Sequence, residues 1–207
     1  MLAPPRSRNV RRRNASPPSS PGSVRIVAGS LRGSRLDVPP RAGLRPTPDR
    51  VRETLFNWLA PVIAGARCLD AYAGTGALGI EALSRGAAEC VFVERDRELA
   101  DRLRGNLARL HVEGAQVVTM DAGHFLAGPA RPFDVVFLDP PFDADLWSGS
   151  AGRLEQGGWL GADALVYLES PADAALALPH AWSVHREARA GAVRYALYRR
   201  HGGDPLS

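Results

Sequence analysis

The sequence contains no lysine, so all 26 of its basic residues are arginine. It also lacks any run of the roughly 18 uninterrupted apolar residues that a membrane span needs, and its basic start has no apolar stretch typical of a signal peptide. The two cysteines, Cys68 and Cys90, are too few for a disulfide framework or a metal cage, and both lie in apolar runs that predict inert core thiols. We therefore expect a cytoplasmic protein with no membrane association.

The length and composition predict one folded unit. A chain of 207 residues with 45% hydrophobic residues is long and apolar enough to bury one sizeable core. Its five histidines are scattered without the spacing of metal ligands, so we predict no metal site. They are His111, His124, His180, His185 and His201.

Positive charge is concentrated at the start of the chain. Residues 1–52 carry 12 arginines against two acids, a local charge of +10, whereas residues 53–207 carry 14 arginines against 20 acids, a local charge of −6. The guanidinium group offers a planar fork of donors that matches phosphate oxygens, so this segment favours a polyanionic partner such as nucleic acid. A solvated basic tail without a partner is the alternative.

Four segments are expected along the chain. Residues 1–23 are rich in proline, serine and arginine and predict a disordered basic arm. Residues 24–64 predict an extension made of a β-hairpin and a helix, residues 65–201 the main domain, and residues 202–207 a flexible tail.

The extension shows two short alternating segments, Val24–Gly29 and Ser34–Val38, which predict the two strands of the hairpin. Thr47 is placed as the N-cap of the following helix, with Pro48 at its first position. Apolar residues then recur on one helical face as far as Val62.

From residue 67 onward, short apolar runs alternate with helical segments, which is typical of a parallel sheet covered on both faces. We predict an α/β fold with a doubly wound, mostly parallel sheet of about seven strands that ends in an antiparallel hairpin. The expected strands are 67–71, 90–94, 116–119, 133–138, 164–169, 182–189 and 193–200, and the expected helices are 77–85, 97–110, 122–126 and 146–154.

The first strand of this region leads into a glycine-rich turn, Gly74-x-Gly76-x-x-Gly79, that opens a helix. This spacing is the dinucleotide-binding fingerprint, and Glu94 falls where an acid would bind a ribose. Asp70, however, places a carboxylate beside the turn, where it would repel a pyrophosphate but attract a cationic group.

A second motif follows the apolar strand 133–138. It is Asp139–Phe142, an aspartate followed by two prolines and a phenylalanine. The Pro-Pro backbone has no amide hydrogens, so carbonyl oxygens and the Asp139 carboxylate remain as acceptors beside an aromatic ring. This combination suits a planar group that carries an amino group.

Together these motifs resemble the class I S-adenosylmethionine-dependent amino-methyltransferases. The strings Arg25–Gly33 (RIVAGSLRG) and Leu44–Leu59 (LRPTPDRVRETLFNWL) are similar to the RsmD type within that superfamily. The resemblance covers about residues 25–200. It implies a Rossmann-like fold and methylation of the 2-amino group of one guanine in 16S rRNA, on the small ribosomal subunit or an assembly intermediate in which ribosomal proteins are part of the substrate.

The resemblance also implies roles for individual residues, with S-adenosyl-L-methionine as the cofactor and a monomer as the simplest state. The implied catalytic residues are Asp139, Pro140 and Phe142; the implied cofactor-binding residues are Asp70, Tyr72, Gly74, Gly76, Glu94, Asp121 and Ala122; the expected RNA-binding residues are Arg25, Arg32, Arg45, Arg50 and Arg52.

Several alternatives stay open from the sequence. The same acceptor-Pro-Pro-aromatic loop occurs in enzymes that methylate DNA adenine or protein glutamine, and the glycine turn is compatible with an NAD(P)-dependent oxidoreductase. A nucleic-acid binder with a degenerate site is a third alternative. Asp121 could instead cap the helix that follows it.

Overall fold

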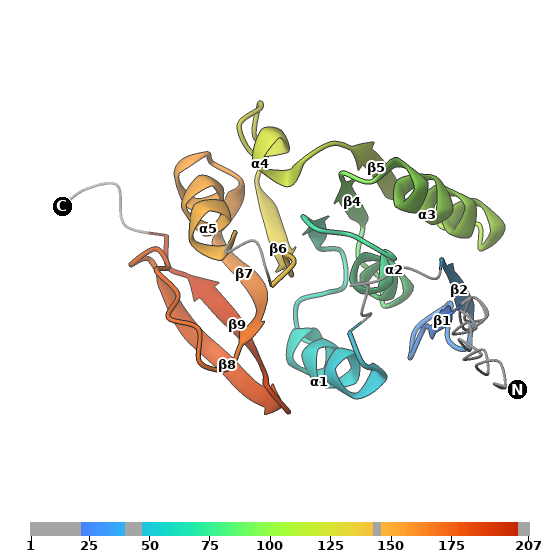
Figure 1. Cartoon of the computed structure of the whole chain (residues 1–207), viewed down its shortest axis with the longest axis horizontal. Coiled ribbons are helices and arrows are strands. Elements are labelled where there is room, and N and C mark those ends of the chain that lie inside the picture. The colour runs from blue at the N-terminus through green and yellow to red at the C-terminus, as the bar shows by residue number, and fades with distance from the viewer. Residues whose placement is uncertain (1–21, 40–46, 143–145, 203–207) are drawn as a thin grey trace, which may run out of the picture.

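The computed structural model of the protein describes residues 22–39, 47–142 and 146–202 (Figure 1). Residues 1–21 of the expected arm and 203–207 of the expected tail lie outside the described residues. Gly22 and Ser23 belong to the first strand and not to the arm that the sequence predicts for them.

The described elements follow the predicted order. The strands are β1 (Gly22–Arg25), β2 (Arg35–Val38), β3 (Arg67–Asp70), β4 (Glu89–Glu94), β5 (Ala115–Thr119), β6 (Phe133–Leu138), β7 (Leu160–Pro171), β8 (Trp182–Ala190) and β9 (Val193–Arg200). The helices are α1 (Asp49–Leu59), α2 (Ala77–Ser84), α3 (Arg97–Arg109), α4 (Ala122–Phe125) and α5 (Trp147–Gln156).

Strands β3 to β9 form one seven-stranded sheet in the order β5-β4-β3-β6-β7-β9-β8. Pairing is parallel from β5 to β7, and β9 joins antiparallel to both β7 and β8. The chain builds outward from β3 to β5 and then returns to the other side of β3 with β6. Ligands of open α/β sheets bind at such a reversal, beyond the carboxyl ends of the strands. The prediction of a doubly wound, mostly parallel sheet is confirmed.

Two hydrophobic cores cover the two faces of the sheet. One face packs against α1, α2, α3 and the β1–β2 hairpin, and the other packs against α4 and α5. Because strand side chains alternate between faces, residues two apart belong to the same core. The first core contains Cys68, Phe137 and Tyr167. The side chains two positions after each of these residues therefore point to the same face of the sheet.

The N-terminal hairpin is anchored on α2 and α3, at the end of the sheet opposite β8 and β9 (Figure 1). The carboxylate of Glu81 on α2 accepts hydrogen bonds from the backbone amides of Val27 and Ala28 at 2.8 and 2.9 Å. On α3, the side-chain amide of Asn106 exchanges two hydrogen bonds with the backbone of Asp37. These bonds fix the extension to the main domain.

Helix α1 lies over the central strands, where Phe56 contacts Phe137 with ring centroids 5.9 Å apart. The prediction that Thr47 caps this helix is wrong. Pro48 occupies the N-cap position, and the Thr47 hydroxyl instead donates to Glu169 on β7 at 2.9 Å. As an N-cap, the Thr47 oxygen would accept a hydrogen bond from a helix amide. Here the hydroxyl donates to a carboxylate instead, and a hydrogen bond to a charged acceptor is stronger than one between neutral groups. The start of α1 is therefore tied to the carboxyl end of the sheet.

Candidate active site

Acidic side chains gather where the parallel strands end. Asp70 is the last residue of β3, Glu94 is the last residue of β4, and Asp139 directly follows β6. Parallel strands place these ends on one edge of the sheet, so the structure brings together residues that are far apart in sequence.

The carboxylate of Asp70 is almost fully buried at the floor of this edge. One oxygen accepts a hydrogen bond from the backbone amide of Gly79 at 3.1 Å. Burial raises the pKa of Asp70 from 3.8 to about 7, and the negative charge of Glu94 adds to the effect. No arginine among the described residues pairs with Asp70, so this site favours an incoming cation.

The glycine turn is shaped by packing against α3 and β4. Gly76 has a φ of +76°, and a Cβ there would lie 2.3 Å from a Leu103 methyl carbon. At Gly79 a Cβ would lie 2.2 Å from the ring of Phe92. Only glycine allows this close approach of the first turn of α2 to the sheet.

Glu94 holds the turn in place from the neighbouring strand. Its two carboxylate oxygens accept hydrogen bonds from the amides of Gly74 and Asp96, each at 2.8 Å. Each oxygen has a second acceptor direction, which suits the hydroxyl groups of a ribose. The hydrogen bond to Gly74 therefore links Glu94, the residue expected to bind the ribose, to the turn expected to bind the methionine part of the cofactor.

Asp121 and Ala122 lie at the start of α4, beyond β5. The exposed Asp121 carboxylate accepts from the amide of His124 at 3.1 Å, so it caps the helix, as the alternative interpretation anticipated. The oxygen Oδ2 forms no hydrogen bond within the described part of the chain, and an adenine contact there stays a prediction. Tyr72 is half-buried, and its hydroxyl lies 2.8 Å from Oγ of Ser150 on α5.

The loop after β6 presents the expected acceptor groups. Asp139 is half-buried, Pro140 is buried and Phe142 is 43% exposed, with its ring centroid 5.8 Å from that of Trp147. Burial and the nearby charges of Glu169 and Asp70 raise the pKa of Asp139 well above its usual range. An exposed aromatic ring beside a carboxylate that lacks an ionic partner among the described residues is suited to hold a planar base.

Glu169 is a site residue that the sequence analysis did not identify. It lies in β7 beside the end of β6 and is buried, and its oxygen Oε1 accepts hydrogen bonds from Thr47 and Tyr167 at 2.9 and 2.8 Å. Burial raises its pKa. An acid at the end of an apolar strand, the same pattern as Asp139, was the available signal.

The five arginines expected to contact RNA have different environments. Arg25, Arg32 and Arg50 are exposed, and Arg45 lies outside the described residues. The prediction that Arg52 contacts RNA is wrong, because its side chain is fully buried. It donates to Asp49 and to the backbone carbonyl of Arg25, each at 2.6 Å, so it is structural and cannot reach RNA in this conformation.

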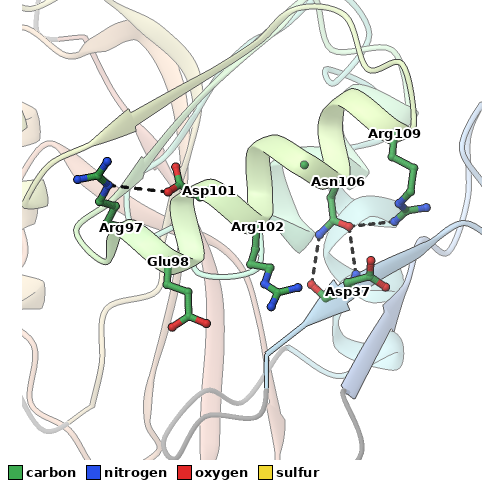
Figure 2. Close-up of a pocket in the computed structure, with 8 residues that line it drawn as sticks. Asp37, Arg97, Glu98, Asp101, Arg102, Asn106 and Arg109 are labelled. Atoms are coloured by element: carbon green, nitrogen blue, oxygen red, sulfur yellow. Dashed lines mark hydrogen bonds and ion pairs between the residues drawn. The ribbon is translucent and has the colours of Figure 1, made fainter.

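An open groove of about 700 Å³ lies between β2 and α3 (Figure 2). Its lining residues include three arginines and three acids, so their charges cancel. They are Asp37, Arg97, Glu98, Asp101, Arg102, Gly105, Asn106 and Arg109. None of the strand-end carboxylates lines this groove, and we assign it no ligand.

The described residues hold neither a cluster of metal-binding side chains nor a helix that could span a membrane. Residues 22–39, 47–142 and 146–202 contain no group of three or more histidine, cysteine or acidic residues placed to hold a metal ion. No helix in the same ranges is long and apolar enough to cross a membrane.

Comparison with known proteins gives a consistent result. The model of the family described as conserved hypothetical protein 95 matches residues 24–199. The chain is 51% identical to ribosomal RNA small subunit methyltransferase D of Escherichia coli strain K12 over 183 residues, which cover 88% of this chain and 92% of the relative. It is 45% identical to the protein of the same name from Haemophilus influenzae, over 87% of this chain and 96% of the relative. The solved structure of yhhF from Escherichia coli is 48% identical, with a TM-score of 0.82 over 87% of this chain and 99% of that one.

Proposed function

Because the chain belongs to the family described as conserved hypothetical protein 95, whose model spans residues 24–199, we propose that it is an S-adenosylmethionine-dependent methyltransferase of small-subunit rRNA. Its methyl acceptor is the 2-amino group of one guanine. The names of the relatives that share half of its sequence support the rRNA substrate. The guanine nitrogen rests on the chemistry of the loop after β6.

One observation carries this proposal: the half-buried Asp139 carboxylate, the buried Pro140 and the exposed Phe142 ring stand together beyond β6, on the same sheet edge as Asp70 and Glu94. Asp139, Pro140 and Phe142 supply acceptors and a stacking surface for an amino-bearing base. Asp70 and Glu94 supply buried negative charge for a cationic ligand. A methyl transfer from a sulfonium to an amine needs both sets of groups side by side.

The residues at the edge fit S-adenosylmethionine. Bound there, the cofactor supplies an electrophilic methyl group on a positively charged sulfur. Asp70 offers a carboxylate without a cationic partner among the described residues, and Glu94 offers acceptors for ribose hydroxyls. A dinucleotide fits less well, because Asp70 would face its pyrophosphate.

The role of the loop follows from the weakness of the nucleophile. The lone pair of the guanine amino group is delocalised into the ring, so the nitrogen must become pyramidal before it reacts. Hydrogen bonds from the amino group to the Asp139 carboxylate and the Pro140 carbonyl favour that geometry and are strongest in the transition state. Phe142 stacks on the extruded base, an interaction worth about 1 to 3 kcal/mol per base.

The RNA approaches over the arginine-rich extension. Arg25, Arg32 and Arg50 are exposed on or beside the hairpin and the start of α1, where they can contact phosphates. Arg45 lies between Arg32 and Arg50 in the sequence and is proposed to act with them. The substrate is a small subunit or an assembly intermediate, with ribosomal proteins as part of the recognised surface, and the enzyme acts as a monomer.

The test uses the full chain, a methyl-labelled donor and small subunits that lack the modification. Label should appear in 2-methylguanosine after nuclease digestion, and mapping should place it at one nucleotide. Asp139→Ala should abolish the transfer while cofactor binding is kept. Asp163→Ala, an exposed aspartate at the start of β7, is the matched control and should stay active.

The alternatives give different outcomes in the same assay. Label in DNA adenine or in a protein glutamine would overturn the rRNA assignment. Titration with a nicotinamide cofactor and with S-adenosylmethionine separates an oxidoreductase from a methyltransferase. We expect S-adenosylmethionine to bind and the nicotinamide cofactor not to bind. Weakening of RNA binding with rising salt is expected for phosphate contacts.

A further inference from the structure

Glu169 and Asp139 occupy matching positions on adjacent strands. In the parallel pair β6–β7, Phe137 is opposite Tyr167 and Leu138 is opposite Leu168, so Asp139 and Glu169 are the next pair in register. Each follows an aromatic residue of the α1–α3 core by two positions, so both side chains point to that face of the sheet. The structure thus pairs a second carboxylate with the one proposed to bind the amino group.

The surroundings of the two carboxylates differ. Oε1 of Glu169 accepts from the hydroxyls of Thr47 and Tyr167, and the indole of Trp147 donates to the Glu169 backbone carbonyl at 2.6 Å. Asp139 accepts no hydrogen bond from the described residues. Donors stabilise the charged form of a carboxyl group, so Glu169 is the member of the pair that holds the negative charge.

The positive charges of the helices on this face, Arg52 and Arg85, pair with Glu81, and the titratable groups beside the two carboxylates are acidic or phenolic. Asp70 ends β3, Tyr167 lies on β7 and Tyr195 lies on β9 opposite Glu169 in the antiparallel register. All three are neutral or negative. No arginine or histidine of the described residues forms an ion pair with Asp139 or Glu169. The negative charge of Glu169 therefore acts directly on Asp139.

We propose that Glu169 is a positioning residue for the transfer, acting through Asp139 so that this carboxylate receives the proton of the methylated amine. The inference rests on the proposed function. As the nitrogen–methyl bond forms, the sulfur–methyl bond breaks and its electron pair stays with sulfur. The nitrogen then carries a positive charge and gives one proton to an Asp139 oxygen, which passes it to water.

Thr47 and Tyr167 have a defined part in this arrangement. Their hydroxyls keep the charge on Glu169, and that charge makes Asp139 the better proton acceptor. Thr47 belongs to the segment that leads into α1, so the N-terminal extension contributes directly to the catalytic edge. This role explains why the Thr47 side chain is turned to the sheet and not to the helix end.

The decisive experiment measures the ionisation of Asp139 and the rate of transfer in the same variants. ¹³C-labelled aspartate in the full chain, with the Asp139 signal identified by its loss in Asp139→Asn, reports the midpoint of its titration by NMR. Single-turnover methylation of unmodified small subunits, measured across pH, gives a pH–rate profile. Its acid limb is the pH range in which the rate falls as the pH is lowered. Variants are Glu169→Gln, Thr47→Val and Glu113→Gln, the last being an exposed control outside the site.

Glu169→Gln should lower both the NMR midpoint and the acid limb by at least about one pH unit, the coupling expected for two interacting carboxyl groups. Thr47→Val should move both in the same direction by a smaller amount, because Glu169 without this donor takes the shared proton itself. Glu113→Gln should match the wild-type protein. Thr47→Val replaces one hydroxyl with a methyl group and leaves both carboxyl groups in place, so it decides the question if Glu169→Gln does not fold.

Coincident titrations of Asp139 in wild type and in both variants would overturn the inference, even with full activity on RNA. An active wild type with an unshifted acid limb in Glu169→Gln would do the same and leave the proposed function intact. A wild type that transfers no methyl group to RNA would instead remove the proposed function and this role with it.

Discussion

Arg52 on α1 and Glu81 on α2 are both fully buried, with Nη1 of the guanidinium 3.7 Å from Oε2 of the carboxylate. Glu81 also accepts from Arg85 and from the amides of Val27 and Ala28, so it joins the hairpin, α1 and α2. Two Arg52 nitrogens, Nε and Nη1, have no hydrogen-bond partner among the described residues. The pair therefore depends on Coulomb attraction and leaves little tolerance for the loss of either charge.

Glu81→Ala should lower the free energy of unfolding by about 3 to 5 kcal/mol, the usual cost of breaking a buried ion pair from one side. The variant leaves Arg52 with Asp49 as its one ionic partner among the described residues and removes the acceptor of two backbone amides of the hairpin. Urea denaturation measures the change. Glu53→Ala, an exposed position on α1, should change stability by no more than about 0.5 kcal/mol, and equal effects at both sites would contradict the structure.

Gly29 and Gly33 provide a matched pair of substitutions in the hairpin. They have similar positive φ angles, +83° and +85°, but a Cβ on Gly29 would lie 1.9 Å from the Ser84 carbonyl oxygen whereas a Cβ on Gly33 would meet nothing within 4 Å. Gly33→Ala should cost about 1 to 2 kcal/mol, the strain of the left-handed region. Gly29→Ala should cost clearly more, because the hairpin must also move away from α2. Thermal and urea unfolding would show this, and equal losses would argue against the close contact.

The buried Asp70 should make stability depend on pH. Its pKa is raised from 3.8 to about 7, so between these values the folded protein holds a proton that the unfolded chain has released. The contribution of Asp70 to the free energy of unfolding should fall as pH rises through this range, by roughly 4 kcal/mol at 1.36 kcal/mol per pKa unit.

Asp70→Asn cannot titrate and keeps an oxygen for the Gly79 amide, so it should lack this dependence. Urea midpoints at several pH values compare the two proteins. Because the charge of Asp70 also raises the pKa of Asp139, the difference reports Asp70 together with its coupling to Asp139. The variant should be relatively more stable at the alkaline end and should bind S-adenosylmethionine more weakly. Parallel pH curves for the two proteins would show that Asp70 titrates normally.

Phe142→Ala should reduce kcat/KM for the RNA substrate by about tenfold to a hundredfold, since base stacking on an aromatic ring contributes about 1 to 3 kcal/mol. Affinity for the cofactor should not change, because the ring lies on the acceptor side of the site. Val62→Ala, another exposed apolar position, serves as the control in the same steady-state assay. Unchanged kcat/KM in Phe142→Ala would exclude the stacking role.

The sequence by itself determined the order of the elements and most of the site. Periodicity located the strands to within a few residues, because buried parallel strands need continuous apolar runs, and the motifs placed Asp70, Glu94 and Asp139 at strand ends. Local patterns carry this information, since each concerns neighbours along the chain.

The tertiary structure alone decided how distant segments use their polar groups. Thr47 had the right residue type for a helix cap, but a carboxylate 122 positions away accepts its hydroxyl. Arg52 had the right charge for RNA, but burial against Glu81 makes it structural. Glu169 acquired its place beside Asp139 only through the β6–β7 register. Hydrogen bonds and ion pairs depend on distance in space and on burial, and the folded chain sets both.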